Sequence, residues 1–241
     1  AAATSTDTNF DTLNPADVTV TNTDGDVAGI TVTPTSGLTT DESGATDTFT
    51  VVLTGQPTAD VVIPISSGDT AEVSVSPASL TFTSGNWDSA QTVTLTGADD
   101  AGAVDGSIPV AITLGAVTSS DTANYDGLDP NDVTVTNNDN DVAGITVSPT
   151  SGLTTTEGGG TAQFTVVLDG APSADVTIAV SSGDESEVTV STSLLTFTSA
   201  NWSTAQTVTL TGIEDSGTVD GDRTVTITLA NSSSSHPAFD N

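Results

Sequence analysis

The sequence predicts an all-β protein, a tandem array of seven-stranded antiparallel immunoglobulin-like sandwiches. Short runs rich in Val, Ile and Thr alternate with Gly, Pro, Asp and Asn, which is typical of half-buried strands joined by turns. No segment has helical periodicity. Residues 26–40 recur as residues 141–155 with one difference in fifteen, an offset of 115 residues (141 − 26). This period fits one small domain and is too long for a solenoid turn.

The first four expected strands of the complete repeat occupy residues 30–33, 48–53, 61–66 and 73–83. Each is rich in β-branched or aromatic residues and ends near Gly, Pro, Asp or Asn, as strands between turns do. Pro77 interrupts the fourth run. Because proline cannot donate to a strand ladder, we expect this strand to be kinked or split and to lie at a sheet edge.

The remaining strands of the repeat are expected at residues 92–96, 108–114 and 133–136. Apolar residues alternate along 108–114, so one face of this strand is expected to point into the core. Two tryptophans separated by the same 115-residue offset, Trp87 and Trp202, are predicted to cover one end of each core.

The repeat divides the chain into residues 1–25, 26–140 and 141–241. The hexapeptide DVTVTN stands at residues 17–22 and 132–137 and does not recur a third time. Residues 1–25 are therefore expected to hold the last strand of a preceding repeat, and residues 141–241 a repeat lacking its last strand. Two explanations remain open: a stretch cut from a longer array, or donor-strand exchange, in which residues 17–22 of one subunit complete the sheet of the next.

Acidic loops are expected to meet at one end of each sandwich. Successive strands reverse direction, so the loops after the first, third, fifth and seventh strands lie at the same end. Each of these loops is acidic, and carboxylates a few ångströms apart repel by on the order of 1 kcal/mol per pair in water. The candidate ligands are Glu42, Asp69, Asp99, Asp100, Asp105, Asp139 and Asp141 in the complete repeat, Glu157, Asp184, Glu214, Asp215 and Asp220 in the second, and Asp24 and Asp26 for a preceding domain.

Calcium is the cation that this composition favours. The chain has 32 acidic residues, one Lys or Arg, one His, no Cys and a net charge of −31. Ca²⁺ takes six to eight oxygen ligands, whereas Zn²⁺ and Cu²⁺ prefer His or Cys. A salt-adapted acidic surface is the competing interpretation, because surplus acids also keep proteins soluble in brine.

The charge also excludes several classes of function. Binding to nucleic acid or to an anionic membrane needs clusters of Lys and Arg. No apolar run approaches the roughly 18 residues of a membrane span. The single histidine, His236, stands in a Ser-rich run predicted to be a flexible loop, and the chain has no Lys or Cys to act as base or nucleophile. We therefore expect no enzymatic activity.

Several segments resemble the Calx-β family of tandem sandwich domains. The matching pieces are 157–160 (EGGG), 195–197 (LTF), 209–215 (TLTGIED) with Asp220, and the linker 138–141 (NDND). The resemblance implies Ca²⁺ ligands from the same four loops. The sequence departs from the family pattern before the fourth strand, where Glu72-Val73 and Glu187-Val188 replace the usual Asp-Tyr.

The near-identical repeats with Asn-Trp turns look like those of large bacterial cell-surface adhesins. We accordingly expect a structural repeat of an extracellular, calcium-stiffened adhesin stalk or surface filament. Its partners would be neighbouring repeats or identical subunits in a linear assembly, with a cell-surface or glycan ligand elsewhere in the protein. The alternatives are a filament subunit polymerised through residues 17–22 and a carbohydrate- or surface-binding module.

Overall fold

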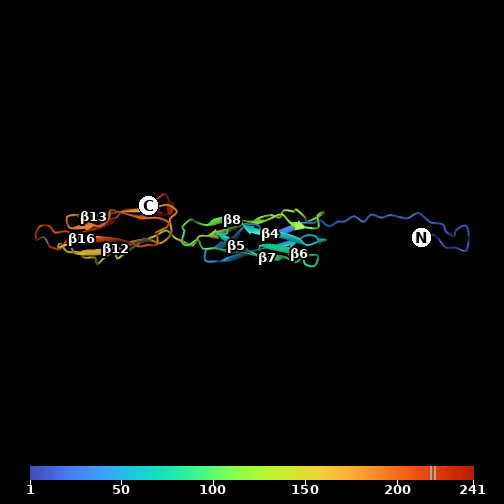
Figure 1. Ribbon diagram of the computed structural model, residues 1–241, viewed down its shortest axis with the longest axis horizontal. Coiled ribbons are helices and arrows are strands. Elements are labelled where there is room, and N and C mark those ends of the chain that lie inside the picture. The colour runs from blue at the N-terminus through green and yellow to red at the C-terminus, as the bar shows by residue number, and fades with distance from the viewer. Residues whose placement is uncertain (218, 220) are drawn as a thin grey trace.

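The computed structural model describes the 241-residue chain except Thr218 and Asp220. Two β-sandwiches follow one another along the long axis of the molecule, and the residues before the first sandwich extend away from it (Figure 1). The N-terminus lies at one extreme of this line, while the C-terminus lies beside the junction of the two sandwiches (Figure 1). Within the described residues, no helix has the length and apolar character needed to cross a membrane.

The first sandwich packs a four-stranded sheet against a larger one. The smaller sheet has the order β1-β3-β7-β5, and the larger has the order β2-β10-β8-β4-β6, with β9 also paired to β4. The strands are β1 (Ile30–Thr33), β2 (Leu38–Asp41), β3 (Thr46–Leu53), β4 (Val61–Ser67), β5 (Val73–Ser76), β6 (Ser79–Phe82), β7 (Gln91–Gly97), β8 (Ile108–Leu114), β9 (Thr118–Ser119) and β10 (Val133–Asn138).

The predicted all-β sandwich is confirmed, and its strand count is corrected. Pro77 divides the expected fourth strand into β5 and β6, which lie at the edges of different sheets. The short strands β2 and β9 were not expected. In addition, β2 pairs with β10 in parallel, so the sandwich is not wholly antiparallel. The expected inward face of β8 is confirmed, because Val110, Ile112 and Leu114 are buried.

The second sandwich repeats this plan with fewer strands among its described residues. Its sheets have the orders β11-β12-β16-β14 and β15-β13-β17. The strands are β11 (Ile145–Ser148), β12 (Thr161–Leu168), β13 (Val176–Ser182), β14 (Val188–Val190), β15 (Leu194–Phe197), β16 (Gln206–Gly212) and β17 (Ile227–Leu229), followed by the 3₁₀ helix η1 (Pro237–Phe239). Within the described residues, no strand takes the positions of β2 and β10.

The pairing partners explain why β2 and part of β8 have no counterpart. In the first sandwich, β10 pairs with all of β2 and with residues 108–112 of β8, while residues 112–114 of β8 pair with β4. Among the described residues of the second sandwich, β17 pairs with β13 alone, as residues 112–114 of β8 pair with β4. A strand needs a neighbour for its backbone groups, so β17 extends only over the paired positions.

The loop between β7 and β8 docks on the second sandwich. The Val104 amide donates to the Ala171 carbonyl (3.2 Å) and the Ala171 amide donates to the Gly102 carbonyl (2.6 Å). The Val104 side chain packs against the second hydrophobic core. Gly102 has φ +92°, and a Cβ there would lie 3.1 Å from the Trp202 ring, so the close approach requires glycine. Trp87 and Trp202 each pack against the core of their own sandwich, as predicted.

His236 does not lie in a flexible polar loop, which corrects the sequence-based expectation. It is buried at the start of η1, where its Nδ1 accepts a hydrogen bond from the Ser173 amide (3.1 Å). Its ring meets the buried Phe239 ring edge-to-face, with the centroids 5.3 Å apart. The histidine is thus part of the packing at this end of the second sandwich.

Candidate metal centre

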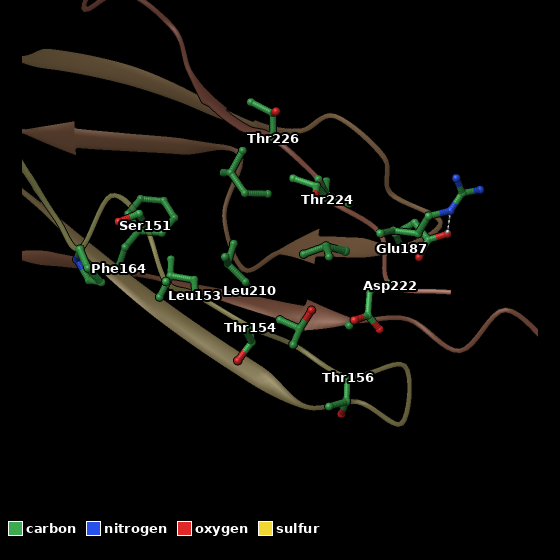
Figure 2. A pocket seen from close by; sticks show the side chains of 18 of the residues that line it. Ser151, Leu153, Thr154, Thr156, Phe164, Glu187, Leu210, Asp222, Thr224 and Thr226 are labelled. Carbon is green, nitrogen blue, oxygen red and sulfur yellow. Dashed lines mark ion pairs between the residues drawn. The ribbon is translucent and has the colours of Figure 1, made fainter. Parts of the chain in front are cut away.

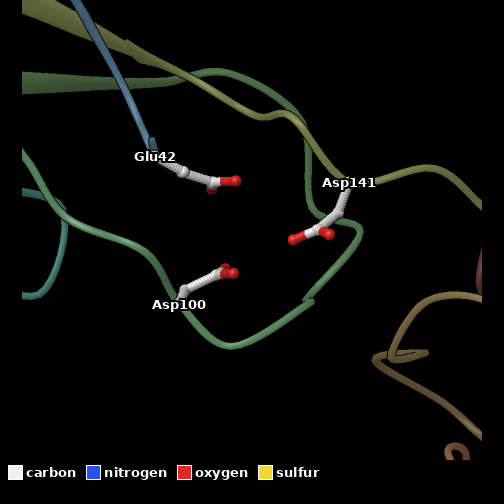
Figure 3. Close-up of side chains that lie close together, drawn as sticks. All are labelled: Glu42, Asp100 and Asp141. Carbon is white, nitrogen blue, oxygen red and sulfur yellow. The ribbon is translucent and has the colours of Figure 1, made fainter. Parts of the chain in front are cut away.

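Acidic side chains from four segments meet at the end of the first sandwich that faces the second. Glu42 follows β2, Glu72 precedes β5, the β7–β8 loop carries Asp100 and Asp105, and the linker after β10 carries Asp141. Figure 3 shows the carboxylates of Glu42, Asp100 and Asp141 pointing into a common space. The strand directions that predicted acidic loops at one end therefore do bring several of them together.

The carboxylates form two overlapping triads. Glu42, Asp100 and Asp141 each offer one oxygen, and these oxygens lie within 4.8 Å of one another. The same limit holds for Glu72, Asp100 and Asp105, so Asp100 belongs to both groups. Glu42 is buried, and Asp100 and Asp141 are half-buried. Such an oxygen-only set fits the ligand preference of Ca²⁺.

Backbone amides hold the linker against the loops. The Asn140 amide donates to Glu42 Oε2 (3.1 Å), and the Gly106 amide donates to Asp139 Oδ2 (2.8 Å). The Asp141 amide donates to Asp139 Oδ1 (2.6 Å). Asp139 thus connects the β7–β8 loop to the linker through its carboxylate, which places Asp141 beside Glu42.

Asn137 lies beneath the triads as a buried polar hub. Its Oδ1 accepts from Thr40 Oγ1 (2.9 Å), and its Nδ2 donates to Glu72 Oε2 and to the Ala98 carbonyl (3.2 Å each). Because β10 runs between β2 and β8, its last inward side chain reaches three separate segments. This network fixes Glu72 in the second triad.

Burial and mutual repulsion raise the pKa of three carboxyl groups at this end. Desolvation is the main cause for Glu42, and the charges of Asp100, Asp139 and Asp141 add to it. Desolvation also raises the pKa of Asp105, with contributions from Asp100, Glu72 and Asp139. The pKa of Asp141 rises for the same reasons, with burial the main cause and the charges of Asp139, Asp100 and Asp99 adding to it. A bound cation would favour the charged form of all three carboxyl groups and so lower their pKa values.

The second sandwich holds a related but more open cluster. Glu157, Glu214 and Asp215 each offer one oxygen within 4.8 Å of the others. Glu157 is exposed, whereas its counterpart Glu42 is only 5 % exposed. Glu187 is the counterpart of Glu72. Its Oε1 lies 3.9 Å from the Nε of Arg223 (Figure 2), whereas Glu72 accepts a hydrogen bond from Asn137. Among the residues that the structure describes, no counterpart of β10 covers this cluster, which accounts for the difference.

The other sequence-predicted ligands lie outside the triads. The carboxylates of Asp69, Asp99 and Asp184 accept from the amides of Ala71, Ala101 and Ser186, respectively, and so cap their own turns. Asp139 is engaged by backbone amides as described above. Asp24 and Asp26 are exposed in the extended segment, where the Asp26 amide donates to Asp24 Oδ1 (3.0 Å). Asp220 lies outside the described residues.

Glu72 was missing from the sequence-predicted ligand set. The sequence showed it only as a departure from the Calx-β pattern, because it replaces an expected Asp-Tyr pair. The available signal was its position: Glu72 directly precedes a strand that starts at the acidic end, and it lies in the same loop as Asp69, three residues further along the chain. It is therefore placed at the acidic end as well as Asp69 is.

Comparison with known proteins gives weak structural matches only. No family model matches this sequence, and neither does any curated protein. The calcium-binding domain CBD12 of CALX1.1 matches with a TM-score of 0.37 and 17 % identity, covering 85 % of this chain and 80 % of that one. CBD12 from CALX1.2 has a TM-score of 0.37 and 15 % identity, with 84 % and 80 % coverage. The class 5 fimbriae chaperone CfaA has a TM-score of 0.36 and 10 % identity, with 84 % and 92 % coverage. Matches at this level assign no function to the chain.

Proposed function

We propose that this chain is a calcium-stiffened structural segment of an extracellular stalk or surface filament, of the kind found on bacterial cells. The observation that carries the proposal is the double role of the β7–β8 loop. Asp100 and Asp105 belong to the acidic triads, while Val104 in the same loop packs into the core of the second sandwich. An ion held by the triads would thus fix the loop that joins the sandwiches.

The mechanism is thermodynamic linkage. Calcium bound by Glu42, Asp100 and Asp141 ties the β2 end, the loop and the linker together, so it favours the docked arrangement over a freely hinged one. Extracellular modules bind Ca²⁺ with dissociation constants of about 10⁻⁴–10⁻³ M. At a hundred times the dissociation constant, one site adds about 2.7 kcal/mol to the stability of the bound state. The partners in this proposal are neighbouring repeats or identical subunits.

The proposed role is non-enzymatic. The chain's single histidine is buried and its Nδ1 already accepts a hydrogen bond, which leaves it poorly suited to move protons for a substrate. The acidic triads face the junction between sandwiches, where a cation supports structure.

Thermal unfolding with calcium and with EGTA tests the proposal. We expect 5–10 mM Ca²⁺, about tenfold above the affinity range of such modules, to raise the melting temperature of the first sandwich. Asp100→Asn should remove most of this shift, because Asp100 serves both triads. Asp88→Asn changes the charge equally at an exposed turn outside the triads and should leave the shift intact.

Sodium chloride distinguishes the salt-adaptation alternative. If NaCl at matched ionic strength reproduces the calcium shift, or if Asp100→Asn and Asp88→Asn respond alike, the acids form a salt-adapted surface and the metal assignment is wrong.

A further inference from the structure

The outer face of one sheet in the first sandwich is covered with hydroxyl groups. In β1, β3, β5 and β7, the side chains that alternate with the core residues point to solvent and are exposed or half-buried. All of these outward positions except Val52 hold Thr or Ser. They are Thr31, Thr33, Thr46, Thr48, Thr50, Ser74, Ser76, Thr92, Thr94 and Thr96.

The strand register arranges these hydroxyl groups in rows. Thr94 of β7 lies opposite Thr48 of β3 on one side and opposite Ser76 of β5 on the other. Neighbouring strands are about 4.8 Å apart, and successive outward residues of one strand are about 6.7 Å apart. Within the part of the chain that the structure describes, the hydroxyls of Thr46, Thr48, Thr92 and Thr94 make no hydrogen bond, whereas the half-buried Thr50 donates to the carbonyl of Thr33 (3.2 Å). The free hydroxyls can donate to a ligand and accept from it.

The second sandwich presents the same kind of face. Its strands β11, β12, β14 and β16 contain no charged residue. Thr209 of β16 lies opposite Gln163 of β12, as Thr94 lies opposite Thr48 in the first sandwich. Figure 1 shows β7 and β12 on one side of the long axis, and β8 and β13 on the other. The two hydroxyl faces therefore follow one another along one side of the molecule.

The absence of charge on this face contrasts with the net charge of −31 for the chain. Asp47 is the single acid within β1, β3, β5 and β7, and it points away from the face: its Oδ2 accepts from the Thr39 amide of the opposite sheet (3.0 Å). The chain as a whole repels polyanions, and its acidic loops would draw a polycation away from the sheet. The face is therefore matched in charge to an uncharged partner.

The residue types on the face favour a polysaccharide over a protein. Protein interfaces are enriched in aromatic residues, Met and Arg, and Thr, Ser and Val rarely dominate their binding energy. None of the enriched types stands among the outward residues of these strands. A neutral polysaccharide offers hydroxyl groups that both donate and accept, and C–H groups that pack against the Thr methyls. The χ1 angle of Thr is restricted, so little side-chain freedom is lost on binding.

We propose that the outer face of β1-β3-β7-β5, together with that of β11-β12-β16-β14, binds an extended, uncharged polysaccharide that lies along both sandwiches. Each hydrogen bond to the polymer replaces one to water and adds little affinity. Binding therefore depends on many contacts, and a polymer held by one sandwich meets the second face at a high effective concentration. The acidic triads take no part, so this binding needs no calcium and is independent of the proposed function.

Co-sedimentation with insoluble polysaccharides tests the proposal. The full chain is mixed with cellulose, chitin or cross-linked dextran in EGTA at physiological ionic strength, and we expect saturable binding to at least one of them. Thr48→Val, Thr92→Val and Thr94→Val combined keep the shape and β-propensity of the side chains and remove three hydroxyls. This triple variant should bind about tenfold or more weakly. Stronger binding by the more apolar variant would show non-specific adsorption and overturn the proposal.

The opposite sheet supplies the matched control. Thr81→Val, Thr113→Val and Thr134→Val combined remove three exposed hydroxyls from its outer face and should leave binding unchanged. A carboxylated form of the polysaccharide that binds should retain far less of the parent chain, because its charge has the same sign as that of the protein.

An oligosaccharide locates the binding face. When a soluble oligosaccharide of the polysaccharide that binds is added, amide NMR signals of residues 46–50, 92–96, 161–165 and 207–211 should shift, and those of residues 108–114 should not. The proposal is overturned if none of the three polysaccharides retains the parent chain, if the two triple variants bind alike, if the carboxylated polymer binds equally well, or if the shifts concentrate in residues 108–114.

Discussion

At the scale of single residues, a buried amide organises the candidate metal centre. Asn137 is 1 % exposed, and its side chain joins β10 to Thr40, Glu72 and the Ala98 carbonyl. A buried polar group is costly unless it is paired, and here all of its hydrogen-bonding atoms have partners. The hydrogen bonds of Asn137 therefore hold Glu72 in place beside the other carboxylates, even though these carboxylates repel one another.

Replacing this hub should destabilise the first sandwich. Asn137→Ala leaves the Glu72 carboxylate and the Ala98 carbonyl without their donor, and we expect a loss of about 1–3 kcal/mol in the free energy of unfolding. Asn138→Ala is the matched control, since the neighbouring side chain is exposed. Urea denaturation measures both, and equal losses would show that the hub does not contribute.

The raised pKa values give the metal-free protein a defined pH dependence. Because Glu42, Asp105 and Asp141 bind protons more tightly when folded, their protonation stabilises the fold, and the melting temperature in EGTA should rise as pH falls from 7 toward about 4.5. Asp121, whose pKa is lowered mainly by the Thr58 amide, opposes this only below its ordinary value of 3.8.

Calcium should reverse that trend, because protons compete with the ion for the same oxygens. In Ca²⁺ the melting temperature should fall over the same pH interval. Glu42→Gln should flatten both profiles. Parallel profiles in EGTA and in Ca²⁺ would contradict the assignment of these carboxyl groups as ligands.

At the scale of elements, the alternating sequence predicted most strands of the first sandwich and the common end of its acidic loops. It did not predict β2, because residues 38–41 form a strand only where β10 supplies a partner. It also did not place Glu72, whose role depends on Asn137, 65 residues away along the chain. Both depend on pairing between distant segments, and local patterns of apolar and polar residues do not encode such pairing.

The β7–β8 loop is the element on which stiffness should depend. Val104→Asp places a charge against the second core, so we expect the two sandwiches to move independently while each stays folded. The matched control is Val219→Asp, since this counterpart is 100 % exposed. NMR relaxation measures the rotational correlation time of each sandwich. No difference between the two variants would remove Val104 from the proposed coupling.

At the scale of the whole molecule, the distribution of charge bears on how the two sandwiches dock. The net charge of −31 opposes close packing of the sandwiches. The contacts of the β7–β8 loop with the second sandwich work against this repulsion. Calcium at the junction would lower the repulsion where the acids are densest, so the proposed metal site would favour the docked arrangement over a freely hinged one.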